Sequence, residues 1–177
     1  TLQLIKVRAL LELGKPDAVE EILRRLIVLY PDDPSFKYSL ARFHLAQGKK
    51  DKAEAEFRAV VAANPKDVNA KIEVVRFLAS VQGSKAAKAE LQALLSADPG
   101  NTELLFALAG LHQAEGDREA ADDVLRKIMA KAGDTQDGLR AKGLLAGSLL
   151  AGKDKTGAKA LVKDILAKDA RNEQALI

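Results

Sequence analysis

The sequence predicts an all-helical protein, built as an array of helix–turn–helix units that repeat every 34 residues. Three prolines set this period, since Pro31, Pro65 and Pro99 lie 34 residues apart, each inside a short turn. Five further columns of small or apolar residues keep the same spacing over three units. They are Ala53/Ala87/Ala121, Phe57/Leu91/Leu125, Val60/Leu94/Ile128, Leu40/Val74/Leu108 and Ala41/Val75/Ala109. Self-similarity at one fixed period indicates a stacked array of supersecondary units.

The composition fits close-packed helices. Of the 177 residues, 47% are hydrophobic and 30% charged, which is typical of a folded chain. Aromatic residues make up only 4% and Trp is absent, so Leu, Val, Ile and Ala must form the core. The net charge of +3 is too small to indicate nucleic acid or membrane binding by itself. Cysteine is absent, which excludes disulfides and thiolate sites.

The residues from 34 to 67 show how each unit is built. Apolar residues recur every three or four positions in its first helix, at Phe36, Leu40, Phe43 and Ala46. Gly48 is the expected cap at the end of that helix. The second helix carries its own apolar face, at Ala53, Phe57, Val60 and Val61. Pro65 ends it, because the residue before a proline is pushed out of the helical region.

We expect a single array of five units. They span approximately residues 1–33, 34–67, 68–101, 102–135 and 139–172, and residues 173–177 begin a truncated further helix. The last unit follows a short insertion, 134–138, and is rich in glycine. Mid-helix glycine costs about 1 kcal/mol relative to alanine, so we expect this unit to be the softest. Its glycines indicate a hinge, a site where the backbone of a partner approaches closely, or a degenerate repeat with tight helix contacts. The chain stops on Leu176 and Ile177 rather than on a polar capping helix, which predicts a fragment of a longer array.

This pattern resembles the tetratricopeptide repeat (TPR) family over essentially the whole chain. The matching landmarks are Leu40, Ala41, Gly48, Ala53, Phe57 and Pro65. The family's tryptophan is replaced by Lys37, and its tyrosine by His44 and His112. The resemblance implies a right-handed α-solenoid, an α–α superhelix of about five units, whose concave groove is lined by the first helix of each pair. The Ala/Leu/Lys-rich composition is similar to that of bacterial arrays.

Two motifs suggest chemistry but lack essential parts. Residues 147–153 match a phosphate-binding loop, but Asp154 stands where that loop needs Ser or Thr and would repel phosphate. His44 and His112 share a column two periods apart, which is too far for one metal ion.

The adjacent carboxylates also lack a catalytic partner. Glu20-Glu21 and Asp122-Asp123 fall on second helices, where we expect solvated faces. The sequence therefore predicts a protein that is not an enzyme, with no catalytic, cofactor-binding or metal site.

One constellation keeps the period and could bind a partner. Arg8, Arg42 and Arg76 lie 34 residues apart, one on each first helix. A second column lies four residues before the arginines and consists of Leu4, Tyr38 and Ile72. Phe106 takes the same slot in the next repeat. By resemblance to the family both columns line the groove, where they suit a peptide with acidic and apolar residues.

The arginine column does not continue, because glycines 110 and 147 take its next two slots. Its alternative role is structural, with each arginine pairing with a nearby acid such as Glu73 or Glu12.

These observations favour a protein–protein interaction scaffold that binds a partner protein or peptide in its groove. The alternative is an architectural spacer within a larger bacterial envelope, polysaccharide-export or secretion protein. A nucleic-acid-binding solenoid is less favoured, and no nucleic acid partner is expected. Membrane insertion is not expected either, because no apolar run approaches the roughly 20 residues of a membrane span. The partner, the pathway and the oligomeric state stay open, and the compartment is either cytoplasm or periplasm.

Overall fold

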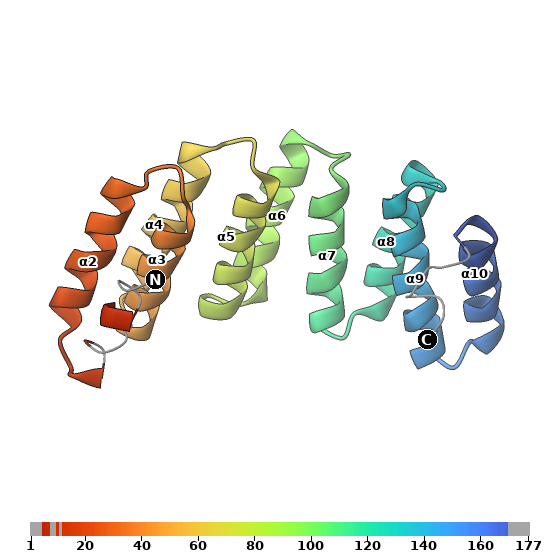
Figure 1. The fold of residues 1–177 in the computed structure, drawn as a ribbon. Helices are drawn as coiled ribbons and strands as arrows, with labels where there is room; N and C mark the ends of the chain where they lie inside the picture. Colours follow the sequence, from red (N-terminus) through yellow and green to blue (C-terminus); the bar gives the residue numbers. More distant parts are fainter. Residues whose placement is uncertain (1–4, 8–9, 11, 170–177) are drawn as a thin grey trace. The chain divides into compact units, whose positions relative to one another are not determined.

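A computed structural model describes residues 5–7, 10 and 12–169 of the chain. Within these residues every regular element is an α-helix, which confirms the predicted fold class (Figure 1). The helices are α2 (Pro16–Leu29), α3 (Ser35–Ala46), α4 (Lys50–Ala63), α5 (Val68–Val81), α6 (Ser84–Ala97), α7 (Thr102–Ala114), α8 (Arg118–Ala132), α9 (Gln136–Ala151) and α10 (Lys155–Lys168).

The chain forms two compact parts, residues 1–81 and 82–177, each of which contains several repeats. From here on they are called the first unit and the second unit. In the first unit α2 packs on α3, α3 on α4, and α4 on α5. In the second, α6 packs on α7, α7 on α8, α8 on α9, and α9 on α10. Each helix therefore buries its apolar face mainly against its neighbours in sequence, as expected of a solenoid.

The small residues of the repeat lie where neighbouring helices meet. Ala41 and Ala53 in the first unit and Ala87 in the second are fully buried. Larger side chains fill the space around them, and Phe57 illustrates this in the first unit. Its ring centroid lies 5.6 Å from that of Tyr38 on α3 and 5.1 Å from that of Phe77 on α5. One aromatic side chain thus joins three helices.

The turn from α3 to α4 and the turn from α7 to α8 have the same geometry. Gly48 and Gly116 adopt the left-handed conformation, with φ of 72° and 78°, which costs glycine little. The amide of the next residue then donates to a carbonyl in the last turn of the helix, from Lys49 to His44 and from Asp117 to His112, each at 2.9 Å. This is the expected glycine cap, and it brings the chain back to begin the second helix.

Helix α9 begins earlier than the repeat comparison suggests. It starts at Gln136, inside the segment 134–138 that the sequence sets apart as an insertion. Thr135 makes this start possible, because its hydroxyl oxygen accepts a hydrogen bond from the amide of Gly138 at 3.4 Å. Gly138 is also sterically required, since a Cβ there would collide with the carbonyl oxygen of Gly133. At this glycine the tight-contact interpretation is correct.

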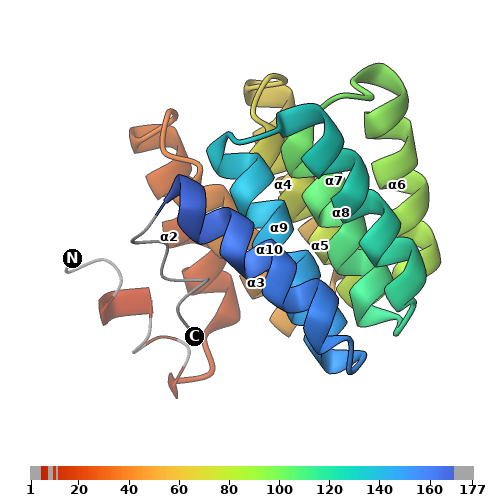
Figure 2. The same cartoon turned by 90° about the vertical axis from the view of Figure 1, so that its right-hand side faces the viewer.

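Helix α9 packs against both α8 and α10 (Figure 2). An ion cluster holds it against α10. The Lys142 ammonium is largely buried and contacts Asp164 on α10 at 2.5 Å and Asp134 at 3.0 Å. Lys168 contacts the second oxygen of Asp134 at 2.9 Å. The hydrogen bond to Asp164, then that to Asp134, raises the pKa of Lys142. Hydrogen bonds from Lys168 and Lys142 lower the pKa of Asp134.

Candidate functional site

Helices α7, α8 and α9 enclose a pocket of about 300 Å³ in the second unit, called here the α7–α9 pocket. Two first helices, α7 and α9, form its sides, and the second helix α8 contributes the rest. Its lining combines apolar side chains, glycines and a few polar groups. The lining includes Phe106, Gly110, Arg118, Asp122, Leu125, Arg140, Leu144, Gly147 and Ser148.

Two glycines open the pocket between α7 and α9. Gly110 and Gly147 lie inside these helices, and both are exposed. A Cβ built on either one would meet no other atom within 4 Å. Gly110 and Gly147 take the position in the repeat that Arg42 and Arg76 occupy in earlier repeats. The pocket is therefore found where the arginine column stops.

A cation–π contact forms the wall at the start of α9. The guanidinium carbon of Arg140 lies 4.1 Å from the centroid of the Phe106 ring. A nitrogen of the same guanidinium lies 3.3 Å from the carboxylate of Glu103, one turn earlier on α7. The ring contact favours this position of Arg140, and the Glu103 carboxylate offsets part of its charge, although both members of the ion pair are about half exposed.

Asp122 contributes the most unusual group in the pocket. The residue is only 7% exposed, and its Oδ1 atom has no hydrogen-bond partner among the described residues. The expectation of a solvated Asp122-Asp123 pair is therefore wrong for Asp122. Asp123 is exposed and pairs with Arg126 at 3.0 Å. The buried arc of α8 is wide enough to include Asp122 beside Ala121, so adjacent residues point to different environments.

Of the seven groove residues predicted from sequence, Leu4 and Arg8 lie outside the described residues. The apolar members are more buried than a binding surface requires, since Ile72 and Phe106 are each 7% exposed and Tyr38 is half-buried. Burial, and then the charges of Asp67 and Glu73, raise the pKa of Tyr38, so its phenol stays neutral at physiological pH. Tyr38 and Ile72 support the helices that carry Arg42 and Arg76, whereas Phe106 lines the α7–α9 pocket.

The two described arginines of the column lie on first helices of the first unit. Arg76, on α5, pairs with Glu73 at 2.5 Å, as in the structural alternative considered from sequence. Such exposed pairs contribute little and can exchange partners. Arg42, on α3, is also exposed.

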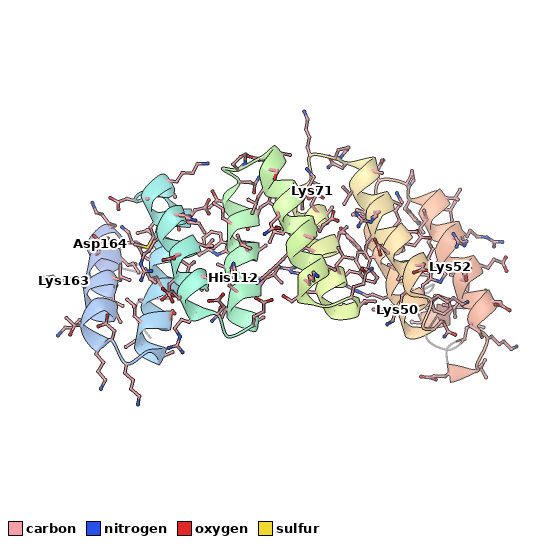
Figure 3. All side chains as sticks on the ribbon, turned by 180° about the vertical axis from the view of Figure 1, so that it is seen from behind. Lys50, Lys52, Lys71, His112, Lys163 and Asp164 are labelled. Carbon is pink, nitrogen blue, oxygen red and sulfur yellow. The ribbon has the colours of Figure 1, made fainter. Side chains whose placement is uncertain are left out.

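The histidines have unequal environments. His44 is completely buried, and neither ring nitrogen has a hydrogen-bond partner in the described part of the chain. Burial lowers the pKa of His44, although the carboxylate of Glu20, 4.0 Å from Nε2, opposes this effect. His112, on α7, is only partly buried, and its Nδ1 lies 3.5 Å from Asp117 (Figure 3).

The phosphate-loop match has a structural explanation. Gly147 lies inside α9, and the Asp154 carboxylate caps α10 by accepting from the amide of Gly157 at 2.9 Å. The amides that a phosphate would need are thus already used. Over the described ranges, no group of three or more His, Cys, Asp or Glu side chains is placed to hold a metal ion. Over the same ranges, no helix is both long and apolar enough to cross a membrane.

Comparisons with known proteins agree on one family. Two models of the tetratricopeptide repeat match residues 6–68 and 85–141, together more than half of the chain. No curated protein matches the sequence significantly.

Several solved structures share the fold. One is a thermophilic TPR protein from Thermus thermophilus, with 20% identity, a TM-score of 0.60, and 98% of this chain and 93% of that chain covered. MamA from Desulfovibrio magneticus RS-1 has 16% identity and a TM-score of 0.56, with 97% and 96% covered. The TPR-like repeats of a putative kinesin light chain from Podosopora anserina have 18% identity and a TM-score of 0.56, with 97% and 95% covered. At these identities the likeness concerns the fold alone.

Sequence reasoning missed both the pocket and Asp122. A signal for the pocket is present in the sequence, because the two glycines mark the end of the arginine column. The signal for Asp122 is its helical register, since Leu125 follows it at three residues and places it beside the apolar face of α8, whereas Asp123 is followed by Arg126 and Lys127.

Proposed function

Because the chain belongs to the tetratricopeptide repeat family, we propose that it binds a segment of a partner protein against the face formed by its first helices. Members of this family are typically non-enzymatic scaffolds for protein–protein interaction. The observation that carries the proposal for this chain is the α7–α9 pocket. It opens between two first helices, at the glycine slots of the repeat register.

The size of the pocket supports a peptide rather than a large cofactor. About 300 Å³ is the lower end of the range for ligand sites in proteins and accommodates one anchoring side chain. Apolar walls from Phe106, Leu125 and Leu144 would bury the anchor, and polar groups at the rim would bind the peptide backbone. An extended partner segment could thus bind through one buried side chain and several surface contacts.

In the first unit, we propose that Arg42 and Arg76 contact acidic residues of the partner. Both are exposed on first helices, α3 and α5, and the guanidinium group forms paired hydrogen bonds with carboxylates. Arg76 would exchange its exposed Glu73 partner for a carboxylate of the ligand. This role is independent of the pocket and needs its own test.

Filling the pocket tests the central proposal. Random peptides displayed on phage are selected against the full chain, and their affinities are measured for the native protein and for Gly147→Leu. The new side chain projects into open space, so we expect the fold to persist and the affinity to fall about tenfold or more. The matched control is Ala160→Leu, which adds the same side chain on an exposed position of α10. Equal affinities of native protein and Gly147→Leu would overturn the proposal.

Charge reversal tests the first unit. In Arg42→Glu/Arg76→Glu, acidic selected peptides should lose affinity, whereas Lys50→Glu/Lys52→Glu should have a much smaller effect. The control makes the same change in charge on α4, a second helix (Figure 3). Unchanged binding in the arginine variant would exclude these residues from the interface. If the pocket variant also bound normally, the spacer role would be favoured.

A further inference from the structure

We propose that the α7–α9 pocket selects a basic side chain, lysine or arginine, from the partner segment, with the Asp122 carboxylate as its acceptor. This inference rests on the proposed function and specifies its ligand. It also differs from the sequence-based expectation for the array, in which acidic and apolar residues of the partner were the anchors. The second unit presents a buried carboxylate on a second helix, α8, whereas the first unit presents exposed arginines on its first helices, α3 and α5.

The burial of Asp122 is the first argument. Buried polar groups in folded proteins are almost always hydrogen-bonded, because leaving one without a partner is costly. Asp122 is more than nine-tenths buried and lines the pocket, and its Oδ1 has no partner in the described part of the chain. The Oδ1 atom itself has almost no accessible surface, so the carboxyl group must turn about χ2 to present it to the pocket; a ligand N–H donor would then remove that cost. Such a donor is worth most when it carries a positive charge.

The shape and polarity of the walls are the second argument. Lysine and arginine carry a charged end on an apolar stem, and the stem prefers contact with hydrocarbon. Phe106, Leu125 and Leu144 supply such surface around Asp122, and Gly110 and Gly147 leave space for the stem to enter. An acidic side chain would instead place its carboxylate against that of Asp122.

The arginines of the pocket must also be considered, because they favour the opposite charge. The charge of Arg140 is partly offset by Glu103, and its guanidinium lies over Phe106, so its net field in the pocket is reduced. Arg118 lies one turn before Asp122 on α8 and is exposed at the edge of the pocket. It makes no hydrogen bond to the Oδ1 atom of Asp122, although residues four apart share one face of a helix. We therefore expect Arg118 to compete with a basic ligand for Asp122 rather than to bind the ligand.

Two substitutions with opposite expected signs test the inference. Peptides selected on the full chain should share a lysine or arginine, and its replacement by norleucine should lower affinity about tenfold or more. Asp122→Asn should cause a similar loss, and the two losses should not add when combined. Arg118→Gln should strengthen binding, because it removes the competing cation. Circular dichroism and the melting temperature check that both variants remain folded.

The outcomes separate this inference from the proposed function. Selected peptides that bind through the pocket but share no basic residue, or whose affinity is unchanged in Asp122→Asn, would overturn the inference and leave the proposed function intact. Weaker binding in Arg118→Gln with stronger binding in Asp122→Asn would show that the pocket selects an acid, and would also overturn it. If Gly147→Leu has no effect on any selected peptide, the proposed function fails as well.

Discussion

At the scale of single residues, three helical glycines of the second unit have two opposite roles. Gly138 fits under a backbone carbonyl at the start of α9, whereas Gly110 and Gly147 have open space where a side chain would be. The first is required by packing. The other two weaken their helices, since glycine inside a helix costs about 1 kcal/mol relative to alanine. We infer that this cost is tolerated because it keeps the pocket open.

Alanine substitutions should separate these roles. Gly110→Ala and Gly147→Ala should each raise the free energy of unfolding by about 0.5–1 kcal/mol, because neither backbone is left-handed and neither Cβ meets an obstacle. Gly138→Ala should lower it by about 1–3 kcal/mol through overpacking. Urea denaturation measures all three. Destabilisation by Gly147→Ala would mean that the open space is filled in solution.

His44 should make stability depend on pH below neutrality. Burial lowers its pKa in the folded state, so the unfolded state, with a pKa of about 6.5, binds the proton first. Stability contributed by neutral His44 is therefore lost as the pH falls below about 6.5. We expect the melting temperature to fall more for the native protein than for His44→Leu between about pH 7.5 and about pH 5.5. Equal falls in the two proteins would exclude this role.

Residue-level prediction from sequence succeeded where the period repeats and failed where a residue has no counterpart. Gly48 and Gly116 were both predictable from the position of the turn. For Asp122 only a position beside the apolar face of α8 was predictable, because helical spacing does not show how wide the buried arc is. The early start of α9 depended on the Thr135 cap, which a comparison of repeat units treats as part of an insertion.

At the scale of helices, the Lys142 cluster is the clearest polar contact between neighbouring elements. Its ammonium is largely buried, whereas Asp134 and Asp164 are each about half exposed. Removing the carboxylates of such a cluster leaves a buried positive charge without a partner. This lowers the stability of the fold far more than replacing the lysine by an apolar side chain of similar length.

Removing the two carboxylates and removing the lysine should therefore have different effects on the melting temperature. Asp134→Asn/Asp164→Asn should lower the melting temperature clearly, and Lys142→Met should change it little, as measured by circular dichroism. The folded-state pKa of Asp134 is depressed, so its contribution is present above the unfolded pKa of about 3.9 and is lost as the pH falls below that value. A larger effect of Lys142→Met than of the double variant would contradict this account.

At the scale of the whole molecule, an array in which each helix contacts mainly its sequence neighbours should respond locally to damage. Phe57→Ala removes the side chain that joins α3, α4 and α5 and should cost about 3–5 kcal/mol. Hydrogen exchange should then accelerate most in residues 16–81 and much less in residues 102–168. Equal acceleration throughout would show that the two compact units unfold as one.

The whole-molecule claim is that the chain is a scaffold whose first helices hold a partner segment. The most direct test is an NMR titration of the full ¹⁵N-labelled chain with a selected basic peptide. We predict that the largest amide shifts fall on Gly110, Gly147 and Ser148, which line the α7–α9 pocket, and that Asp122→Asn needs about ten times more peptide to reach them. Shifts confined to the exposed faces of α4 and α10, with the pocket amides unmoved, would contradict the account.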